Sequence, residues 1–513
     1  MTRPAVYIVG AGPGDPGLIT VHAVECLRLA DVVVYDSQVS RRLLAHARPD
    51  AELIDVGTPS SSRAMAQEAI SYLLAEKARE NKLVVRLRRG DPFVFDCGGE
   101  EALFLHEQGI PFEVVPGIPG GIAVPAYAGV PVSYPGGGDT ITLVRGNEDD
   151  NREFPDVDWA ALTRLGGTVV CYASAQQLPR MLESLKTGGW PADGTAIIVY
   201  DGTLPTQETL SGTLAELIEQ VHASPRRRSA ILVVGRVVGF REHMRWFDAR
   251  PLFGRRVLVT RPREQAGVLV DRLVSLGAEP IEAPMIRIVP PEDLQPLRRA
   301  VAHADTFDWI IFTSANAVDA FMTALLSGDR DVRALHGPRL CAVGTGTADK
   351  LAGYGIKVDL VPQEFRAEAL VTAVAAQGPL EGARVLLPRA DIGRDVIAER
   401  MREVGAVVTD VVAYRTVLED TRREGDPDIY RMLLDGQIDA VTFTSASAVR
   451  NFATVYGQDQ AADLLAHTAI ATIGPLTADA VVQLGLRVTI QPSSYTVPAL
   501  VDAVAAHFKS RRP

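Results

Sequence analysis

Two stretches of the C-terminal half carry nearly the same sequence, and this duplication constrains the fold more than any other feature. Residues 312–321 read FTSANAVDAF, and residues 443–452, 131 positions later, read FTSASAVRNF. Other matches keep almost the same spacing, at offsets of 130 or 128: Gly344 with Gly474, Gly277 with Gly405, and Arg261 with Arg389. A repeat of this size predicts two similar lobes, and the cleft between two lobes is the usual place for a ligand.

Short runs rich in valine and isoleucine alternate with stretches rich in alanine, leucine and arginine along the chain. Such runs include Val6–Val9, Val32–Tyr35, Val257–Thr260, Trp309–Thr313 and Ala440–Thr444. The alternation predicts an α/β fold with largely parallel sheets. A boundary is predicted within His243–Arg256, which contains a proline, a glycine and several charges before a new strand begins. We therefore expect one domain over residues 1–248 and a second over residues 254–513.

The composition limits the partners and the compartment. The chain of 513 residues has a formal net charge of −11, whereas a nucleic-acid-binding protein needs a net basic face. No apolar run approaches the roughly 18 residues that span a bilayer, and the first residues show no signal region. The four cysteines and nine histidines lie in no metal-binding spacing. We expect a cytoplasmic protein without a metal that binds neither nucleic acid nor a membrane.

Each copy of the repeat ends a strand in Thr-Ser and then opens a helix. The hydroxyl groups and free N–H groups at such a helix start form an anion site, although Ser and Thr are also favoured simply as helix caps. Glycine-rich turns let a ligand approach the backbone closely, and arginines that follow strands would meet carboxylates. The candidate substrate-binding residues are Arg261, Thr313, Ser314, Gly344, Thr345, Arg389, Thr444, Ser445 and Gly474.

A tyrosine occurs in only one copy of the repeat. At the offset of 128, Tyr414 falls opposite Ile286, so a shared scaffold does not account for the phenol. It lies in the run Asp410–Val417, which we expect to pass between the lobes. A tyrosine there would donate a proton or a hydrogen bond to a leaving group. The alternative is a half-buried tyrosine whose tip contacts water, which is common in proteins.

The C-terminal half resembles the uroporphyrinogen-III synthases over residues 254–513. The resemblance rests on an ordered set of motifs: VLVTRP, FTSANAV, AVGTGTA, LLPRAD, VVAYRT, FTSASAV and ATIGPLTADAV. It implies two α/β lobes joined by a two-stranded ladder, one lobe from about 254–284 with 418–513 and the other from about 289–410. It also implies that hydroxymethylbilane is cyclised to uroporphyrinogen III, with inversion of the last pyrrole ring and without a cofactor. The family's linker tyrosine falls on Tyr414, which this resemblance makes the candidate that assists departure of the hydroxyl group.

The N-terminal half begins with a strand that leads into a glycine-rich turn, Gly10–Asp15. Together with RLRRGDPFVFDCGGEE, VVPGIPGGIAVPAYAGVPV and PTQETLSGTL, this turn resembles the two-lobed tetrapyrrole methyltransferases, specifically uroporphyrinogen-III C-methyltransferase, over residues 1–248. That family uses S-adenosylmethionine, yields precorrin-2 and is usually dimeric through this domain. The resemblance implies Asp15 as the catalytic base and cofactor contacts at Pro13, Gly90, Asp91 and Gly202.

Several cleft residues depart from the methyltransferase pattern. Arg89 replaces a glycine, Asp96 and Cys97 replace a Gly-Arg pair, and Ala173 replaces a methionine. The lost basic side chains would weaken the grip on an octacarboxylate. Three interpretations stay open for this half: an active C-methyltransferase, a domain retained for dimerisation or channelling, and a methyltransferase with a changed substrate.

The main hypothesis for the whole chain is an enzyme that makes precursors of heme, siroheme and cobalamin. For the C-terminal half, the alternative is a bilobal ligand-binding or regulatory module that keeps the cleft without catalysis. Tyr414 and the paired Thr-Ser turns favour the enzyme.

Overall fold

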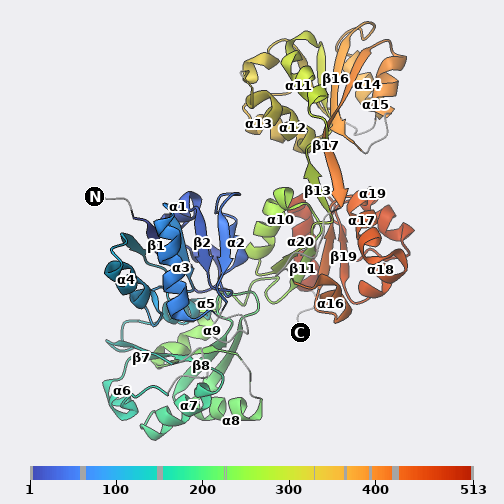
Figure 1. The fold of residues 1–513 in the computed structure, drawn as a ribbon. Coiled ribbons are helices and arrows are strands. Elements are labelled where there is room, and N and C mark those ends of the chain that lie inside the picture. The colour runs from blue at the N-terminus through green and yellow to red at the C-terminus, as the bar shows by residue number, and fades with distance from the viewer. Residues whose placement is uncertain are drawn as a thin grey trace. The chain divides into compact units, whose positions relative to one another are not determined.

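The computed structural model describes residues 4–57, 65–146, 154–224, 226, 228–328, 330–362, 367–391, 396–418 and 427–509. The chain divides into two compact units (Figure 1). The first comprises Met1–Arg256 with Arg272–Pro280 and Ala505–Pro513, and the second Val257–Asp271 with Ile281–Val504. Strands and helices alternate in both, which confirms the predicted α/β class. No helix within these described ranges is long and apolar enough to cross a membrane.

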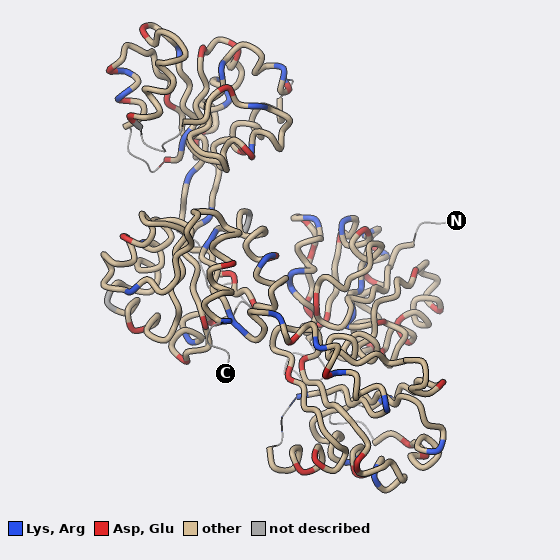
Figure 2. Tube along the Cα trace, turned by 180° about the vertical axis from the view of Figure 1, so that it is seen from behind, with Lys and Arg blue, Asp and Glu red and all other residues tan. Residues whose placement is uncertain are grey.

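Charges of both signs are spread over the molecule. Figure 2 shows Lys and Arg residues interspersed with Asp and Glu residues along the trace of both units. With a formal net charge of −11, the binding of an anion depends on individual arginines placed in a cleft rather than on a basic face.

The first unit opens with a parallel five-stranded sheet in the order β3-β2-β4-β1-β5. Its strands are β1 (Val6–Gly10), β2 (Val32–Tyr35), β3 (Glu52–Asp55), β4 (Val84–Arg88) and β5 (Phe112–Val115). Its helices are η1 (Pro16–Leu18), α1 (Val21–Leu29), α2 (Arg41–Leu44), α3 (Gln67–Arg79) and α4 (Gly98–Glu107). β2 is apolar throughout because helices cover both faces of a parallel sheet. β4 is an exception, since it buries Arg86 and Arg88.

A second five-stranded sheet follows in the order β6-β7-β10-β8-β9, and three of its four strand pairs are antiparallel. Its strands are β6 (Ile141–Val144), β7 (Thr168–Ala173), β8 (Thr195–Tyr200), β9 (Glu208–Thr213) and β10 (Ala230–Val234). The helices around it are α5 (Gly120–Tyr127), α6 (Trp159–Leu165), α7 (Gln177–Thr187), α8 (Leu214–Ala223), η2 (Arg236–Phe240) and α9 (Arg241–Met244). The expectation of largely parallel sheets does not extend to this one, because a strand buried on both faces has the same sequence pattern in either direction.

Beyond residue 255, one sheet has the strand order β12-β11-β18-β19. Its strands are β11 (Arg256–Val259), β12 (Glu279–Glu282), β18 (Ala440–Phe443) and β19 (Ala469–Thr472). The associated helices are α10 (Arg263–Ser275), α16 (Ile429–Leu434), α17 (Ala446–Tyr456), α18 (Gln458–Leu464), α19 (Pro475–Gln483) and α20 (Val497–Lys509). This sheet joins the two ends of the C-terminal half, since β11 pairs in parallel with β18.

The other sheet of this half has the order β13-β17-β16-β14-β15. Its strands are β13 (Ile286–Val289), β14 (Trp309–Phe312), β15 (Arg339–Ala342), β16 (Arg384–Ala390) and β17 (Val407–Leu418). Its helices are α11 (Gln295–Ala302), η3 (Ala304–Thr306), α12 (Ala315–Leu326), η4 (Val332–Leu335), α13 (Thr345–Gly353), α14 (Ala367–Ala375) and α15 (Val396–Glu403). The antiparallel pair of β13 with the end of β17 forms a two-stranded ladder, with Ile286 opposite Leu418.

The two copies of the repeat fold alike, as the duplication predicts. Ser314 and Ser445 are the N-caps of α12 and α17, and their hydroxyl oxygens accept hydrogen bonds from the backbone N–H groups of Ala317 and Ala448. The same turn therefore closes the same strand-to-helix connection twice.

Each copy also packs a strand phenylalanine edge-on against a helix phenylalanine. The ring centroids of Phe312 and Phe321 lie 5.4 Å apart, and those of Phe443 and Phe452 lie 5.8 Å apart. All four rings are fully or almost fully buried. Such pairs hold each helix start in place against its strand.

We predict that Phe452→Ala lowers the free energy of unfolding of the C-terminal half by about 3–5 kcal/mol, because it opens a cavity against Phe443. Urea unfolding of the full chain, followed by circular dichroism, measures the loss. Val482→Ala on α19 is the control, since Val482 is 62% exposed and its truncation is expected to cost less than about 0.5 kcal/mol. Equal losses in the two variants would contradict the packing described.

Candidate functional site

A cavity of about 290 Å³ in the second unit brings some of the predicted substrate-binding residues together. Arg261, Ser314 and Gly344 line it. The remaining lining residues were not predicted from the sequence: Gln265, Ala315, Asn316, Gly346 and Thr347. One of them, Asn316, could have been noticed in the sequence, because it aligns with Ser447 and so differs between the two copies of the repeat.

Arg261 supplies this cavity with a positive charge. Burial lowers the pKa of its guanidinium from the ordinary value, although an arginine remains protonated at neutral pH. Within the described residues its hydrogen bond is long, 3.4 Å from Nε to Oε1 of Gln265. The Gln265 amide in turn donates from Nε2 to Oδ1 of Asn316 over 2.5 Å. A partly buried cation that, among the described residues, bonds to an amide and not to a carboxylate favours an anionic ligand.

Two helices begin at the same cavity. Ser314 is the N-cap of α12 and Gly344 is the N-cap of α13, and both residues line the cavity. A Cβ added at Gly346 would meet no atom within 4 Å, so the first turn of α13 is open to a ligand. Free N–H groups at helix starts carry partial positive charge. Together with Arg261, they suit the cavity to a carboxylate.

Tyr414 contacts Ser314, which lines the cavity. Its hydroxyl oxygen lies 3.1 Å from Oγ of Ser314, and its ring is only 9% exposed, in the core that contains Phe312 and Leu386. Tyr414 is thus more buried than the alternative interpretation expected, and its catalytic role stays a prediction. Tyr414 is absent from the lining, so the serine hydroxyl stands between the phenol and the cavity.

A β-bulge in β17 turns Tyr414 toward Ser314. Arg389 of β16 pairs with Val412, but the next residue, Ala390, pairs with Tyr414, so Ala413 is the extra residue. Successive side chains of a regular strand point to opposite faces, yet Ala413 and Tyr414 are both buried in the same core. The bulge therefore puts the phenol on the face where α12 begins.

The other predicted substrate-binding residues do not line this cavity: Thr313, Thr345, Arg389, Thr444, Ser445 and Gly474. Arg389 is engaged within its own sheet, where Nε donates to Oδ1 of Asp410 over 2.6 Å. Ser445 caps α17, and its Oγ lies 2.9 Å from Oγ of Ser447. Their participation in substrate binding stays a prediction.

The first unit contains a larger cleft of about 1130 Å³, lined by loops and strands of both its sheets. The residues predicted to contact the cofactor all line it: Pro13, Gly90, Asp91 and Gly202. Asp15, the predicted base, does not. Its carboxylate accepts hydrogen bonds from the backbone N–H of Gly17 at 2.8 Å and from the hydroxyl of Tyr127 at 2.7 Å. Burial and then the bond to Asp15 raise the pKa of Tyr127.

Three glycine-containing turns meet beside this cleft without room for side chains. A Cβ at Gly117 would lie 2.1 Å from the carbonyl oxygen of Gly90, and one at Gly10 would lie 2.5 Å from the nitrogen of Gly117. Gly90 also has a φ of +68°, which favours glycine. Backbone therefore packs directly against backbone at this edge of the cleft, and a side chain at Gly10 or Gly117 would displace it.

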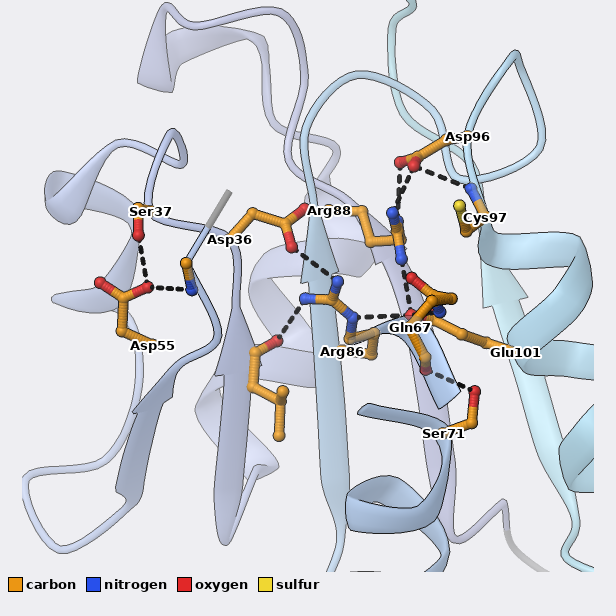
Figure 3. Close-up of polar contacts among 12 residues, drawn as sticks. Asp36, Ser37, Asp55, Gln67, Ser71, Arg86, Arg88, Asp96, Cys97 and Glu101 are labelled. Carbon is orange, nitrogen blue, oxygen red and sulfur yellow. Dashed lines mark hydrogen bonds and ion pairs between the residues drawn. The ribbon is translucent and has the colours of Figure 1, made fainter. Parts of the chain in front are cut away.

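A buried ion-pair network lies at one wall of the cleft (Figure 3). Oε1 of the fully buried Glu101 accepts from Nε of Arg86 at 3.0 Å and from Nη1 of Arg88 at 2.5 Å. Arg86 also donates to Asp36 at 2.6 Å, and Arg88 forms a two-pronged ion pair with Asp96. Two guanidinium groups thus meet three carboxylates, so the network has no surplus positive charge.

Asp96 is one of the residues that depart from the methyltransferase pattern. Its carboxylate forms an ion pair with Arg88. A second arginine of the cleft, Arg228, is likewise paired with Asp201 and Glu208. Arg89 donates from Nη1 to Oε1 of Gln38 over 2.8 Å. The N–H donors of these arginines are therefore bonded to protein groups, which reduces the number of donors that the cleft can provide to a polyanion.

Comparisons with known proteins match both halves. The model of uroporphyrinogen-III synthase HemD matches residues 267–502, and that of the tetrapyrrole (corrin/porphyrin) methylases matches residues 5–218. The porphyrin biosynthesis protein HemD of Ruminiclostridium josui is 35% identical over 502 residues, which cover 98% of each chain.

Two further relatives are named as methyltransferases. The uroporphyrinogen-III C-methyltransferase of Bacillus subtilis is 37% identical over 371 residues, 72% of this chain and 76% of the relative. The S-adenosyl-L-methionine-dependent uroporphyrinogen III methyltransferase of Methanosarcina barkeri is 42% identical over 233 residues, 45% of this chain and 91% of the relative. The chain therefore belongs to the family of HemD-type fusion proteins, with a tetrapyrrole methylase domain ahead of a uroporphyrinogen-III synthase domain. The resemblance inferred from the motifs is confirmed.

We predict that Glu101→Gln destabilises the methylase domain by about 3–5 kcal/mol, because it leaves two buried guanidinium groups without their shared carboxylate. Thermal unfolding of the full chain measures the loss. The neighbouring Glu100 is exposed on α4, so Glu100→Gln is a matched control that should unfold like the unchanged protein. A Glu101→Gln variant as stable as this control would refute the role assigned to the network.

Proposed function

We propose that the synthase domain cyclises hydroxymethylbilane to uroporphyrinogen III with inversion of the last pyrrole ring. The observation that carries the proposal is the cavity where Arg261 and two helix starts meet and where the Tyr414 hydroxyl lies 3.1 Å from Ser314 Oγ. The substrate is a flexible chain with eight carboxylates. A desolvated guanidinium and free helix N–H groups are suited to hold one of them.

The reaction itself depends mainly on positioning. Loss of hydroxide from the bilane leaves a cation that the pyrrole stabilises, and the chain must then fold through a spiro intermediate so that the correct carbon closes the ring. Holding the carboxylates fixed restricts the reacting ends to that geometry. Tyr414 assists the departure of hydroxide, which supplies the acid step that starts the reaction.

A coupled assay tests this function against that of a bilobal binding module. Hydroxymethylbilane is supplied to the full chain, and the uroporphyrinogen isomers are separated by chromatography. Enzymatic closure yields isomer III, whereas spontaneous closure yields isomer I. Isomer I alone, at a rate that the protein does not change, would refute the synthase and favour the binding module.

We predict that Tyr414→Phe lowers kcat for isomer III by about 10²–10⁴-fold, because it removes the proton that assists the leaving group. The measurement is the initial rate in the same assay. Tyr354→Phe is the matched control: Tyr354 packs against the same core, and its hydroxyl donates to Asp319 at 2.9 Å, away from the cavity. Loss of activity in the control as large as in the Tyr414 variant would show that the effect is structural.

For the methylase domain we infer that the cleft keeps a pocket for S-adenosylmethionine. Its open backbone at Gly90 and Gly120 and its apolar walls at Val124, Val199 and Leu204 suit a nucleoside with an amino-acid tail. The bound cofactor would supply an electrophilic methyl group. The proposed reaction is C-methylation of uroporphyrinogen III towards precorrin-2.

Because the cleft arginines are paired with protein groups, we expect uroporphyrinogen III to bind weakly. The alternative function is therefore a domain retained for dimerisation or for passing the tetrapyrrole between domains. Binding of the cofactor separates the two interpretations, because a domain kept only as a scaffold has no need of it.

We predict that S-adenosylhomocysteine binds the full chain with one site per chain, measured by calorimetry, and that Gly120→Leu abolishes this binding. A Cβ at Gly120 would meet only Tyr172, at 3.6 Å, so the leucine would extend into the cleft without straining the backbone. Gly99→Leu is the control, since Gly99 lies exposed on α4 with no atom within 4 Å of an added Cβ. No binding to the unchanged chain at millimolar concentration would favour the scaffold.

A further inference from the structure

We propose that Ser314 delivers the proton to the leaving hydroxyl group and that Tyr414 is its proton source. The proposal rests on the synthase function proposed above and refines it. Ser314 lines the cavity, whereas Tyr414 does not, although their hydroxyl oxygens are only 3.1 Å apart. A proton from the phenol therefore has to pass through the serine oxygen to reach a ligand in the cavity.

The hydrogen bonds of Ser314 are compatible with transfer in this direction. A serine hydroxyl has one proton to donate and two lone pairs that accept. One lone pair accepts the N–H of Ala317 at 3.1 Å, as expected of a helix cap. If Tyr414 donates to the other lone pair, the Ser314 proton is left to point at the cavity.

The opposite direction is unfavourable. If Ser314 donated to Tyr414, the phenol proton would have no acceptor among the described residues, although the ring is buried. A buried donor without an acceptor is costly, and almost all such groups in proteins are paired. With Tyr414 as donor, the phenol proton has a protein acceptor and the Ser314 proton is left for the ligand.

The resulting step is balanced in protons and electrons. The bond from the hydroxymethyl carbon to oxygen breaks, and both electrons go to oxygen. That oxygen takes the Ser314 proton and leaves as water, while Ser314 takes the Tyr414 proton and leaves a phenolate. When the macrocycle has closed, the pyrrole carbon that formed the new bond loses its proton to restore the aromatic ring. This proton returns through Ser314 to the phenolate.

The second copy of the repeat shows that capping alone does not explain the contact. Ser445 caps α17 in the same way, but its oxygen lies 2.9 Å from Oγ of Ser447, and among the described residues it forms no hydrogen bond with a tyrosine. Both copies therefore keep the cap, and only the first adds a proton source. The bulge at Ala413 is what creates this difference, because it directs Tyr414 to Ser314.

The test measures kcat and KM for isomer III in Ser314→Ala, Tyr414→Phe and the double variant. We expect each single change to lower kcat by about 10²–10⁴-fold with KM changed less than about threefold, and the double change to be no slower than the slower single one. Ser314→Thr, which keeps the hydroxyl, should restore most of the rate. Thr496→Ala removes another hydroxyl cap in this domain, at α20, and should leave the rate unchanged.

Two results would overturn the relay. The first is a Ser314→Ala variant as fast as Thr496→Ala. The second is a double variant whose loss is the product of the two single losses, which would mean that the hydroxyls act independently. If Ser314→Ala does not fold, Ser314→Asn keeps a side-chain cap without a hydroxyl and should fold but remain slow. Absence of isomer III with the unchanged chain would instead refute the synthase function, and the relay with it.

Discussion

One hydroxyl group links the parts of the candidate synthase site. Oγ of Ser314 caps α12, contacts the buried phenol of Tyr414 and belongs to the lining of the cavity that contains Arg261. The position of the helix start, the orientation of the phenol and the shape of the cavity therefore depend on the same atom. A hydroxyl group and a guanidinium held in place in this way provide the kind of preorganisation that the proposed cyclisation requires.

In the cleft of the methylase domain, arginines are paired with carboxylates of the protein itself. Arg86, Arg88 and Arg228 meet the protein's own carboxylates, and Arg86 and Arg88 share the buried Glu101. Buried pairs of this kind hold strands and helices together only while every partner is present. In the synthase cavity, the partner of Arg261 among the described residues is instead an amide, so its charge is available to a ligand. Arg86, Arg88 and Arg228 of the methylase cleft thus face carboxylates, whereas Arg261 of the synthase cavity faces an amide among the described residues.

The sequence predicted the class of fold and the repeat well, because both depend on local patterns. Apolar runs predicted the strands, and the Thr-Ser turns predicted the helix starts at Ser314 and Ser445, where a cap must satisfy free N–H groups. The direction of the strands in the second sheet was not predictable in this way. Of the nominated substrate-binding residues, Arg261, Ser314 and Gly344 share the cavity, since spacing along the chain does not tell which turns meet in space.

By itself, the sequence determined the duplicated scaffold, the glycine turns and the presence of one extra phenol. Only the tertiary structure decided what that phenol contacts. An alternating strand would have placed Ala413 and Tyr414 on opposite faces, but the extra residue of a bulge reverses the alternation at that point. The same holds for Asp96, whose substitution is visible in the sequence although its ion pair with Arg88 is not. The sequence shows which chemical group each side chain carries. The packing of segments that lie far apart in sequence determines which partner that group meets.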